Sequence, residues 1–287
     1  MKKQLMAFFA AVLFCSTAPA RAAPPEVAGR PAAPPPCRIL IDNDDGIDAP
    51  GIHALYKMLK DMCTLVVVAP STQQSGMSHA VPNVSNGLKV RAVPFEDGMG
   101  YAVDGTPAEA ACLGVMTLSD GKPFDLVVLG INEGENTGLG NLYSGTVNGG
   151  MEALVRGTPA IAFSLADEYG DDYARSAPIV RAIVRRALSR RLPPGVMLNV
   201  NIPLNYKAIA VLPSRGLSVL IESFTSSELA NGQTLYRPVV KTNDTPPPGG
   251  DVAAYMAGIV TITPLAMDRT ATRAMKSLQG WARDFRP

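Results

Sequence analysis

The chain contains 287 residues, and its 26 basic and 25 acidic side chains leave a formal net charge of +1 at pH 7. This balance argues against a protein that wraps a nucleic-acid polymer or adheres to an anionic membrane surface. No apolar run long enough to span a bilayer follows the first part of the chain, so the sequence predicts no membrane segment in the folded protein. The length suits one large domain with embellishments.

Residues 1–22 have the pattern of a secretory signal peptide. The basic pair Lys2–Lys3 precedes an apolar segment, 5–15, that is too short to cross a bilayer as a helix. Small residues follow and predict cleavage after Ala20 or Ala22. The alternative is a buried N-terminal helix, which the Pro-rich stretch that follows disfavours. We therefore expect a periplasmic or secreted protein that has no membrane segment after cleavage.

The stretch 23–36 is rich in Pro and Ala, so we expect an extended linker that builds no core. The folded domain should then occupy residues 37–287. Its cysteines are odd in number, although the expected compartment is oxidising. Cys63 and Cys112 lie in apolar patterns and are expected to be small buried side chains. A disulfide at Cys37 cannot be assigned from the sequence.

An acidic loop follows the first apolar run of the domain. Ile39–Ile41 has the composition of a strand and leads directly into Asp42–Gly46, after which helical spacing begins near Pro50. Ligands of open α/β sheets bind outside the carboxyl ends of the strands. Adjacent carboxylates there resist ionisation unless a cation lies between them. Asp44 and Asp45 are therefore candidate ligands of a hard divalent metal, and the alternative is a solvated acidic turn.

A second strand, Leu65–Ala69, completes a βαβ unit whose crossover should be right-handed. Its polar loop should lie beside the acidic loop. Ser75 in this loop offers a hydroxyl oxygen, which magnesium and manganese accept as a ligand. Gly76 permits close approach of the backbone. His79 is expected to have no catalytic role, because a histidine in a polar loop more often has none.

A helix with a complete N-terminal signal follows a predicted hairpin at 83–103. Thr106 suits the N-cap, Pro107 suits the first helical position, and Glu109 completes a capping box. Glu109 therefore has a structural explanation and needs no catalytic one.

The next polar strand end comes after Phe124–Leu129. Asn132, just past this strand, offers an amide oxygen suited to a hard metal. Ser144, Gly145 and Thr146 then begin a helix, and free N–H groups with two hydroxyls form a ready anion site. The alternative is ordinary capping, which needs only one of the hydroxyls.

The remaining pattern predicts further strands and helices of one α/β domain. Acidic residues around 167–172 should form a solvated face, and Tyr173–Arg191 an amphipathic helix. Alternating segments on both sides of Asn231–Gly232 predict an extended hairpin arm over 215–243. A terminal helix, Met275–Asp284, should carry the only tryptophan.

Seven loop segments follow one another in a specific order, although no single segment is specific. The segments are Ile41–Gly46 with Ala49–Gly51, Gln74–Gly76, Gly105–Pro107, Gly130–Asn132 with Asn136, Tyr143–Val147, Asn199–Pro203 and Thr261–Leu265. Taken together, they resemble the loops of the SurE (survival protein E) family of metal-dependent nucleotidases and phosphatases, over roughly Cys37 to Ala271.

This resemblance implies a Rossmann-like α/β fold, with a mostly parallel sheet flanked by helices and a C-terminal β-hairpin arm. It implies one divalent ion per subunit, Mg²⁺ or Mn²⁺. The implied reaction is hydrolysis of nucleoside 5′- and 3′-monophosphates, with other phosphate monoesters as further substrates. It also implies a homodimer or homotetramer assembled through the arm at 215–243.

The resemblance assigns site residues position by position. The implied metal ligands are Asp44, Asp45, Ser75 and Asn132. The implied phosphate-binding residues are Asn43, Gly76, Asn136, Ser144, Gly145 and Thr146. Either Asp44 or Asp45 would also be the catalytic base. Asp42 departs from the family, which commonly has a small hydroxyl residue there, and Glu109–Ala110 replaces the more usual Asp-Cys.

Two other functions remain open. One is a secreted acid phosphatase of broad specificity, with the same site and a looser pocket. The other is a non-catalytic phosphate- or nucleotide-binding protein. The sequence contains no Walker A pattern and no Gly-x-Ser-x-Gly nucleophile elbow, which argues against a P-loop NTPase and an α/β-hydrolase.

Overall fold

The computed structural model describes residues 37–166 and 172–281. The signal peptide expected at 1–22 and the linker expected at 23–36 lie outside the described residues, as does most of the acidic segment near 167. No helix in the described ranges is long and apolar enough to cross a bilayer.

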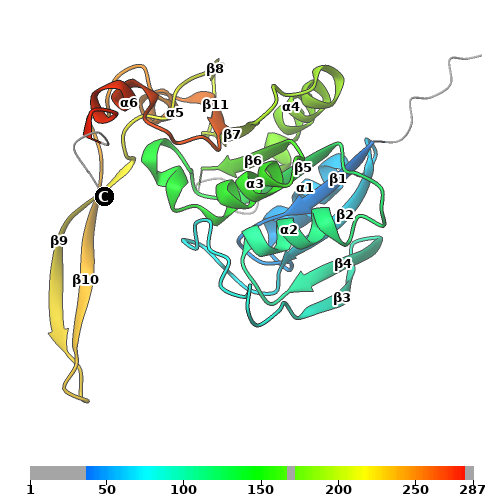
Figure 1. Cartoon of the computed structure of the whole chain (residues 1–287), viewed down its shortest axis with the longest axis horizontal. Helices are drawn as coiled ribbons and strands as arrows, with labels where there is room; N and C mark the ends of the chain where they lie inside the picture. The colour runs from blue at the N-terminus through cyan, green and yellow to red at the C-terminus, as the bar shows by residue number, and fades with distance from the viewer. Residues whose placement is uncertain (1–36, 167–171, 282–287) are drawn as a thin grey trace, which may run out of the picture. The chain divides into compact units, whose positions relative to one another are not determined.

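A mixed sheet of nine strands forms the middle of the described domain, in the order β3-β4-β2-β1-β5-β6-β7-β11-β8 (Figure 1). The strands are β1 (Arg38–Asp42), β2 (Thr64–Pro70), β3 (Val90–Phe95), β4 (Gly98–Val103), β5 (Leu126–Glu133), β6 (Ala160–Leu165), β7 (Val196–Ile202), β8 (Ala208–Val211) and β11 (Ile259–Ala266). Only the β3–β4 and β7–β11 pairs of this sheet are antiparallel. The expected mostly parallel α/β fold is confirmed.

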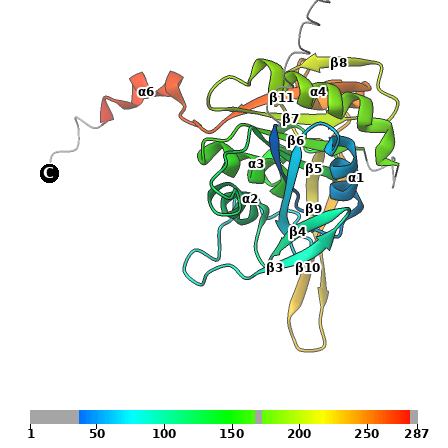
Figure 2. The same ribbon diagram turned by 90° about the vertical axis from the view of Figure 1, so that its right-hand side faces the viewer.

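Helices cover both faces of the sheet (Figure 2). Helices α1 (Pro50–Leu59) and α4 (Ala177–Arg190) pack on one face, while α2 (Pro107–Met116) and α3 (Gly145–Val155) pack on the other. Residues of a strand point alternately to the two faces. Accordingly, the outer two residues of Ile39–Ile41 join the core under α1 and α4, and the middle residue joins the core under α2 and α3. All three are fully buried, as their continuous apolar run predicts.

Helix starts follow the signals in the sequence. The Thr106 hydroxyl accepts a hydrogen bond from the Glu109 N–H at 3.2 Å, and the Glu109 carboxylate accepts one from the Thr106 N–H at 3.1 Å. The predicted capping box is thus confirmed. Helix α4 begins later than predicted, after a short 3₁₀ segment, η3 (Tyr173–Ser176). The reason is Pro178, which lacks an N–H and therefore suits the first turn of a helix.

A disulfide joins Cys37 and Cys63 at the amino ends of β1 and β2, with a Cα–Cα distance of 4.8 Å. Cys63 is buried, as expected, but it is paired and is not a lone small side chain. The cause of the pairing is the strand register, which pairs Arg38 with Thr64 and so sets the two preceding residues side by side. Among the described cysteines, Cys112 is free, and it is only half-buried, so the expectation that it is buried is wrong.

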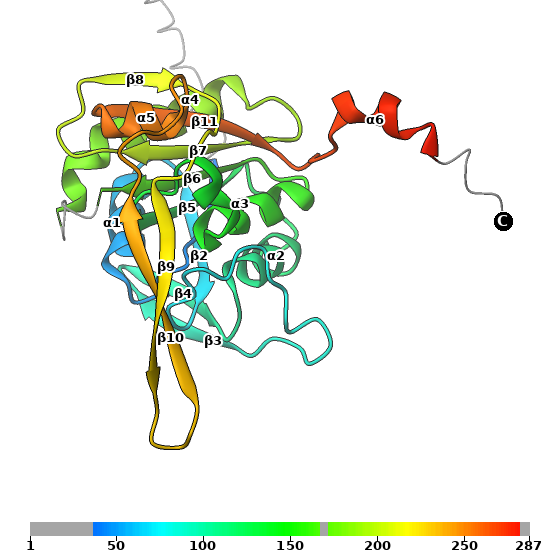
Figure 3. The same cartoon turned by 90° about the vertical axis from the view of Figure 1, so that its left-hand side faces the viewer.

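The hairpin arm is a separate antiparallel pair, β9 (Val219–Glu228) and β10 (Thr234–Thr242), which extends away from the large sheet (Figure 3). The predicted hairpin is present. Large apolar side chains on it face solvent: Ile221, Phe224 and Tyr236 are 63%, 61% and 64% exposed.

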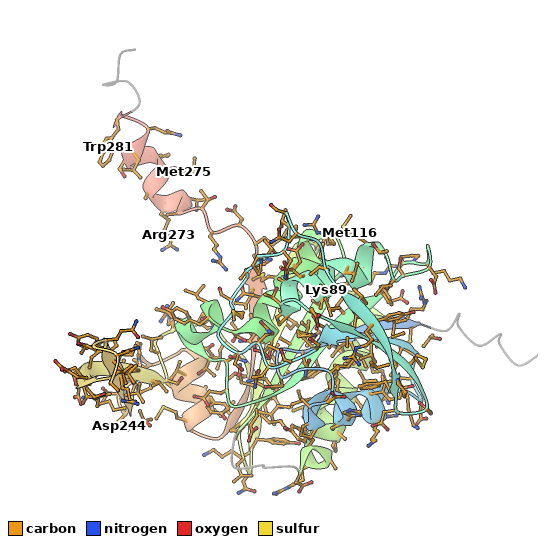
Figure 4. The ribbon with its side chains drawn as sticks, turned by 90° about the horizontal axis from the view of Figure 1, so that it is seen from below. Lys89, Met116, Asp244, Arg273, Met275 and Trp281 are labelled. Atoms are coloured by element: carbon orange, nitrogen blue, oxygen red, sulfur yellow. A yellow bond between two sulfur atoms is a disulfide. The ribbon has the colours of Figure 1, made fainter. Side chains whose placement is uncertain are left out.

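The terminal helix α6 (Thr272–Leu278) begins before the predicted position and has no buried residue. Its side chains Arg273 and Met275, and the following Trp281, lie away from the sheet (Figure 4). Trp281 is 63% exposed. The predicted end of this helix, Asp284, lies beyond the last described residue.

Candidate active site

The loops that carry the predicted site residues meet at one edge of the sheet. Strand β1 lies between β2 and β5, and both pairs are parallel. The carboxyl ends of these three strands are therefore neighbours (Figure 1). The loops after β1 and β2 bring Asp44 and Ser75 to this edge. Asn132 was expected just past its strand, but it lies within β5, one residue before the strand ends.

Backbone hydrogen bonds fix the acidic loop against the loop after β2. The Gln74 N–H donates to the Asp44 carbonyl oxygen at 2.6 Å, and the Ile47 N–H donates to the Pro70 carbonyl oxygen at 2.8 Å. Gly46 turns the chain with a φ of 101°, a conformation that a side chain would strain. The two loops therefore form one rigid unit.

Asp44, Thr146 and Asn132 bring three side-chain oxygens together. The Thr146 hydroxyl donates to Asp44 Oδ1 and lies 3.2 Å from Asn132 Oδ1. One hydroxyl hydrogen can serve only one of these two acceptors. The amide nitrogen of Asn132 donates to the carbonyl oxygens of Glu133 and Gly134, each at 2.8 Å. These bonds fix the amide so that its oxygen faces Asp44 and Thr146.

The start of α3 lies directly against Asp44. A Cβ atom on Gly145 would come within 2.7 Å of the Asp44 Cβ atom and 2.9 Å of Oδ2. Backbone N–H groups of Gly145 and Thr146 also act on the carboxylate and oppose the rise in its pKa. The start of α3, which the sequence predicted to bind phosphate, is therefore already in contact with the Asp44 carboxylate.

The hydroxyl of Ser144 has an ordinary structural role in this arrangement. It accepts a hydrogen bond from the Val147 N–H at 3.1 Å and caps α3. Of the two hydroxyls in the predicted anion site, one therefore caps the helix and the other binds Asp44.

Asp45 connects to Ser75 through Gln73, a residue that sequence reasoning missed. The Gln73 amide nitrogen donates to Asp45 Oδ1 at 3.1 Å. The Gln73 amide oxygen accepts from the N–H and the hydroxyl of Ser75, at 3.1 and 3.0 Å. Ser75 is exposed, Asp45 is half-buried and Asp44 is almost fully buried. The site therefore opens to solvent on the side of Asp45 and Ser75.

The carboxylates of the acidic loop are short of positive charge. Burial raises the pKa of Asp44 and raises that of Asp42 well above its usual range. Burial, with the negative charges of Asp44 and Glu133, raises the pKa of Asp45 to about 6. No Lys, Arg or His in the described ranges forms an ion pair with any of the three loop carboxylates.

This donor set fits a hard divalent cation. Two carboxylates, an amide oxygen and a hydroxyl are the oxygen ligands that magnesium and manganese prefer. The set contains only two acidic ligands, and in the described part of the chain no group of three or more His, Cys, Asp or Glu is placed to hold a metal. A cation here would therefore rely on the neutral oxygens of Asn132 and Ser75 as well as on Asp44 and Asp45.

The remaining predicted residues lie around this centre. The Asn43 amide nitrogen donates to the Gly46 carbonyl at 2.8 Å, and the amide oxygen is buried with no partner in the described structure. Gly76 is exposed in the loop after β2. Asn136 lies farther along the sheet, where its amide donates to Ser164 at 3.0 Å and its N–H to Asn201 at 2.7 Å.

Two ionisable side chains that the sequence analysis considered, His79 and Glu109, have hydrogen-bond partners outside this centre. His79 Nε2 lies 2.8 Å from the Glu152 carboxylate. Glu109 caps α2 and also accepts from the Asn83 N–H at 2.6 Å. Sequence reasoning also missed Glu133, whose negative charge raises the pKa of Asp45. Its sequence context does not distinguish it from Glu135.

Comparison with known proteins identifies the family. A family model described as "Survival protein SurE" matches residues 39–219. A 5′-nucleotidase SurE from Deinococcus radiodurans is 39% identical over 251 residues, which cover 84% of this chain and 92% of that protein. Another from Desulforamulus reducens is 37% identical over 250 residues, which cover 85% and 98%.

A solved structure agrees in fold as well as in sequence. The crystal structure of the SurE protein from Aquifex aeolicus has a TM-score of 0.72 and 35% sequence identity, and the match covers 85% of this chain and 99% of that one. The family match spans the site loops after β1, β2 and β5 together with the start of α3. The chain described here belongs to the SurE family.

Proposed function

We propose that the chain is a metal-dependent phosphomonoester hydrolase that converts nucleoside 5′- and 3′-monophosphates to nucleoside and phosphate. One observation carries the proposal. Asp44 and Asp45 are adjacent carboxylates with raised pKa values and no cationic partner in the described residues, and the amide oxygen of Asn132 faces Asp44 through Thr146. Membership of a family whose relatives are named 5′-nucleotidases supplies the reaction class.

Asp44, Asp45, Asn132 and Ser75 would hold the divalent ion, Mg²⁺ or Mn²⁺. When bound, such an ion draws negative charge from a phosphoryl oxygen and promotes ionisation of the attacking water. Bonds from Asn132 to two backbone carbonyls preset the direction of its oxygen, so little reorganisation is needed on binding.

The exposed side of the site receives the phosphate ester. Ser75 and Gly76 lie there, and Gly76 has a φ of 78° with open space where a Cβ would stand, so the backbone can approach a phosphoryl group closely. Asp45 also faces this side, whereas Thr146 and the start of α3 engage Asp44. We therefore assign the general base, which the sequence left open between them, to Asp45.

The decisive experiment removes and restores the metal. Treatment of the purified chain with EDTA should abolish hydrolysis of AMP, and Mn²⁺ or Mg²⁺ should restore it. Hydrolysis that persists in EDTA would reject the metal mechanism. A chain that binds AMP but turns over none with either ion would instead be the non-catalytic binding protein.

A broad-specificity acid phosphatase would use the same residues. A panel of 5′- and 3′-nucleoside monophosphates and small phosphate esters separates the two functions. The nucleotidase should show a clearly higher kcat/KM for nucleotides than for p-nitrophenyl phosphate. Equal kcat/KM values across the panel would favour the broad-specificity phosphatase.

The proposed location is the periplasm or the exterior, after removal of residues 1–22. The Cys37–Cys63 disulfide supports it, because such bonds persist in oxidising compartments and are rare in the cytosol. Mass spectrometry of protein recovered from the periplasm should find this disulfide and a chain that starts at Arg21 or Ala23. A reduced, full-length chain in the cytosol would contradict the proposal.

The proposed assembly is a homodimer or homotetramer that uses the hairpin of β9 and β10. Its exposed Ile221, Phe224 and Tyr236 are the support, since apolar patches of this kind mark interaction surfaces. Light scattering should give a multiple of the chain mass for the parent and a single mass once residues 219–242 are replaced by a short Gly/Ser turn. An unchanged mass would exclude the hairpin.

A further inference from the structure

A buried carboxylate outside the proposed metal-ligand set organises the loop that leads into α3. Asp251, the first residue of α5 (Asp251–Met256), is fully buried. Its Oδ2 accepts hydrogen bonds from the Gly138 N–H at 2.9 Å and the Thr263 hydroxyl at 3.4 Å. Its Oδ1 accepts from the Arg215 N–H at 2.8 Å and from the N–H of Val252 at 3.0 Å.

Two of these donors belong to segments that matter for the proposed function. Gly138 begins the 3₁₀ segment η1 (Gly138–Leu142), which leads through one further residue to Ser144 at the start of α3. Arg215 lies at the root of the β9–β10 hairpin. Asp251 thus holds the entry to the α3 start with one oxygen and the root of the hairpin with the other.

Further bonds join the same two segments. The Leu139 N–H donates to the Gly216 carbonyl at 2.7 Å. The Ser214 hydroxyl donates to the Gly138 carbonyl at 2.8 Å and accepts from the Asn141 amide at 2.9 Å. The contact is so close that a Cβ on Gly138 would lie 2.3 Å from the Gly216 carbonyl oxygen.

The rigid connection continues from η1 into α3. The Asn148 amide, in the second turn of α3, donates to the carbonyl oxygens of Asn141 and Ser144 at 3.0 and 2.8 Å. A displacement of η1 would therefore be passed to the helix start, where Gly145 and Thr146 contact Asp44. Because small displacements of positioning groups lower catalytic efficiency strongly, the placement of η1 matters for the reaction.

Only a carboxylate satisfies these donors. Asp has two oxygens and about four acceptor positions, whereas Asn replaces one oxygen with an NH₂ group that can only donate. With Asn at position 251, either the buried Gly138 N–H or the partly buried Arg215 N–H would face another donor and lose its acceptor.

We infer that Asp251 is a positioning residue for the side of the active site that Asp44 and the start of α3 form, which it holds in place by fastening η1 to the root of the hairpin. This inference rests on the proposed function for its kinetic consequences. It assigns no contact between Asp251 and substrate, so its effect must reach the site through η1 and the start of α3.

The test compares Asp251→Asn with Glu109→Gln in the full-length, Mn²⁺-loaded protein. Glu109 is a matched control, because it is a buried carboxylate that accepts two backbone N–H bonds but has no bond to η1. Two kinetic readouts are the KM for p-nitrophenyl phosphate and the inhibition constant for inorganic phosphate. A third readout is hydrogen–deuterium exchange of peptides that cover residues 138–146.

For Asp251→Asn we expect both the KM and the phosphate inhibition constant to rise about tenfold or more, with faster exchange at 138–146. Glu109→Gln should lower the melting temperature and leave all three readouts unchanged. A merely structural role for Asp251 would reduce the fraction of active molecules, and thus Vmax, without a change in the KM or the inhibition constant. Unchanged values in folded Asp251→Asn would overturn the inference.

A milder variant covers the case in which Asp251→Asn does not fold. Ser214→Ala removes the hydroxyl that bridges Gly138 and Asn141, and it should shift the same three readouts in the same direction by a smaller factor. No shift in this variant would also overturn the inference. If the parent hydrolyses no phosphate ester with either ion, the proposed function fails, and hydrogen exchange at 138–146 still decides the role of Asp251.

Discussion

Two of the buried carboxylates of this molecule, Asp44 and Glu152, have opposite shifts in pKa. At the carboxyl end of β1, Asp44 is 2% exposed, and its burial raises its pKa. On the outer side of α3, Glu152 is 5% exposed. Burial there also acts to raise the pKa, but hydrogen bonds from His79 and Arg156 outweigh it and hold the pKa below its ordinary value.

The difference lies in the partners and not in the depth of burial. Glu152 has His79 Nε2 at 2.8 Å and an Arg156 nitrogen at 2.6 Å, so the chain itself supplies the positive charge. Among the described residues, the partners of the Asp44 carboxylate are a hydroxyl and backbone N–H groups. Side chains of the protein itself therefore balance the charge of Glu152. For Asp44, the proposed function requires that a bound cation balance the charge.

The largest effect is expected from Asp44→Asn. This change should lower kcat/KM for AMP by about 10³-fold, since several kcal/mol of transition-state stabilisation depend on the metal. The metal-free variant should melt no lower than the parent, because a native pKa above the unfolded value means that the ionised carboxylate destabilises the fold at neutral pH.

Calorimetry of the metal-free protein and kinetics with Mn²⁺ check this prediction together. The parent should gain melting temperature on addition of Mn²⁺, and the variant should not. Full activity of Asp44→Asn would contradict the proposed difference between Asp44 and Glu152. A loss of stability in Asp44→Asn as large as that of a Glu152 variant would contradict it too.

The next largest effect is expected from Gln73→Ala, which tests whether Gln73 orients the proposed metal ligands Asp45 and Ser75. Loss of the amide between Asp45 and Ser75 should weaken Mn²⁺ binding about tenfold or more, as for other residues that orient metal ligands. Gln74→Ala is the matched control, because the side chain of Gln74 reaches only the Thr72 hydroxyl at 3.4 Å. Isothermal titration with Mn²⁺ should separate the two variants, and equal affinities would leave Gln73 without a role.

Glu152→Gln replaces a carboxylate with an amide, as Asp44→Asn does, and tests the surroundings of Glu152. It should lower the free energy of unfolding by about 2 kcal/mol, because the charge-assisted hydrogen bonds from Arg156 and the hydrogen bond with His79 are weakened. Glu222→Gln, which breaks an exposed pair with Lys241, should cost less than about 1 kcal/mol. Urea denaturation in EDTA measures both, and Mn²⁺ affinity should be unchanged in both variants. Loss of metal binding in Glu152→Gln would contradict the proposed difference between Asp44 and Glu152.

The smallest expected effect is a difference in acid sensitivity. The folded pKa of Glu152 lies below its ordinary value of 4.5, so its ion pairs stabilise the fold above that pH. This contribution is lost as the pH falls from there through the folded pKa. Melting curves across this window should fall more steeply for the parent than for Glu152→Gln. Parallel curves would show that the pair contributes nothing to acid stability.

The strand ends make much of the site predictable from the sequence. Asp44 and Asn132 follow apolar runs that had to be buried parallel strands, and adjacency of those strands brings the side chains together. The fold class and the capping box of α2 are predictable for a similar reason, since each rests on local pattern. The metal and phosphate roles of these residues stay predictions.

Other features depend on details that a local pattern does not contain. Cys37 pairs with Cys63 because of one strand register among several conceivable ones. Gln73, and not Gln74, lies between Asp45 and Ser75 because of how the loop after β2 is folded. Asp251 accepts a hydrogen bond from Gly138 across a sequence separation of 113 residues, and the local sequence of neither segment predicts this contact.

The close approach of Asp44 to Gly145 also has an evolutionary consequence. Any side chain at position 145 would have to occupy space that the Asp44 carboxylate already fills, at 2.7 to 2.9 Å from the new Cβ atom. Alanine, which elsewhere is the mildest exchange for a helical glycine, is therefore excluded here by a residue of the loop after β1. Gly145 cannot gain a side chain while Asp44 is kept, so we expect selection that retains Asp44 to retain Gly145 as well.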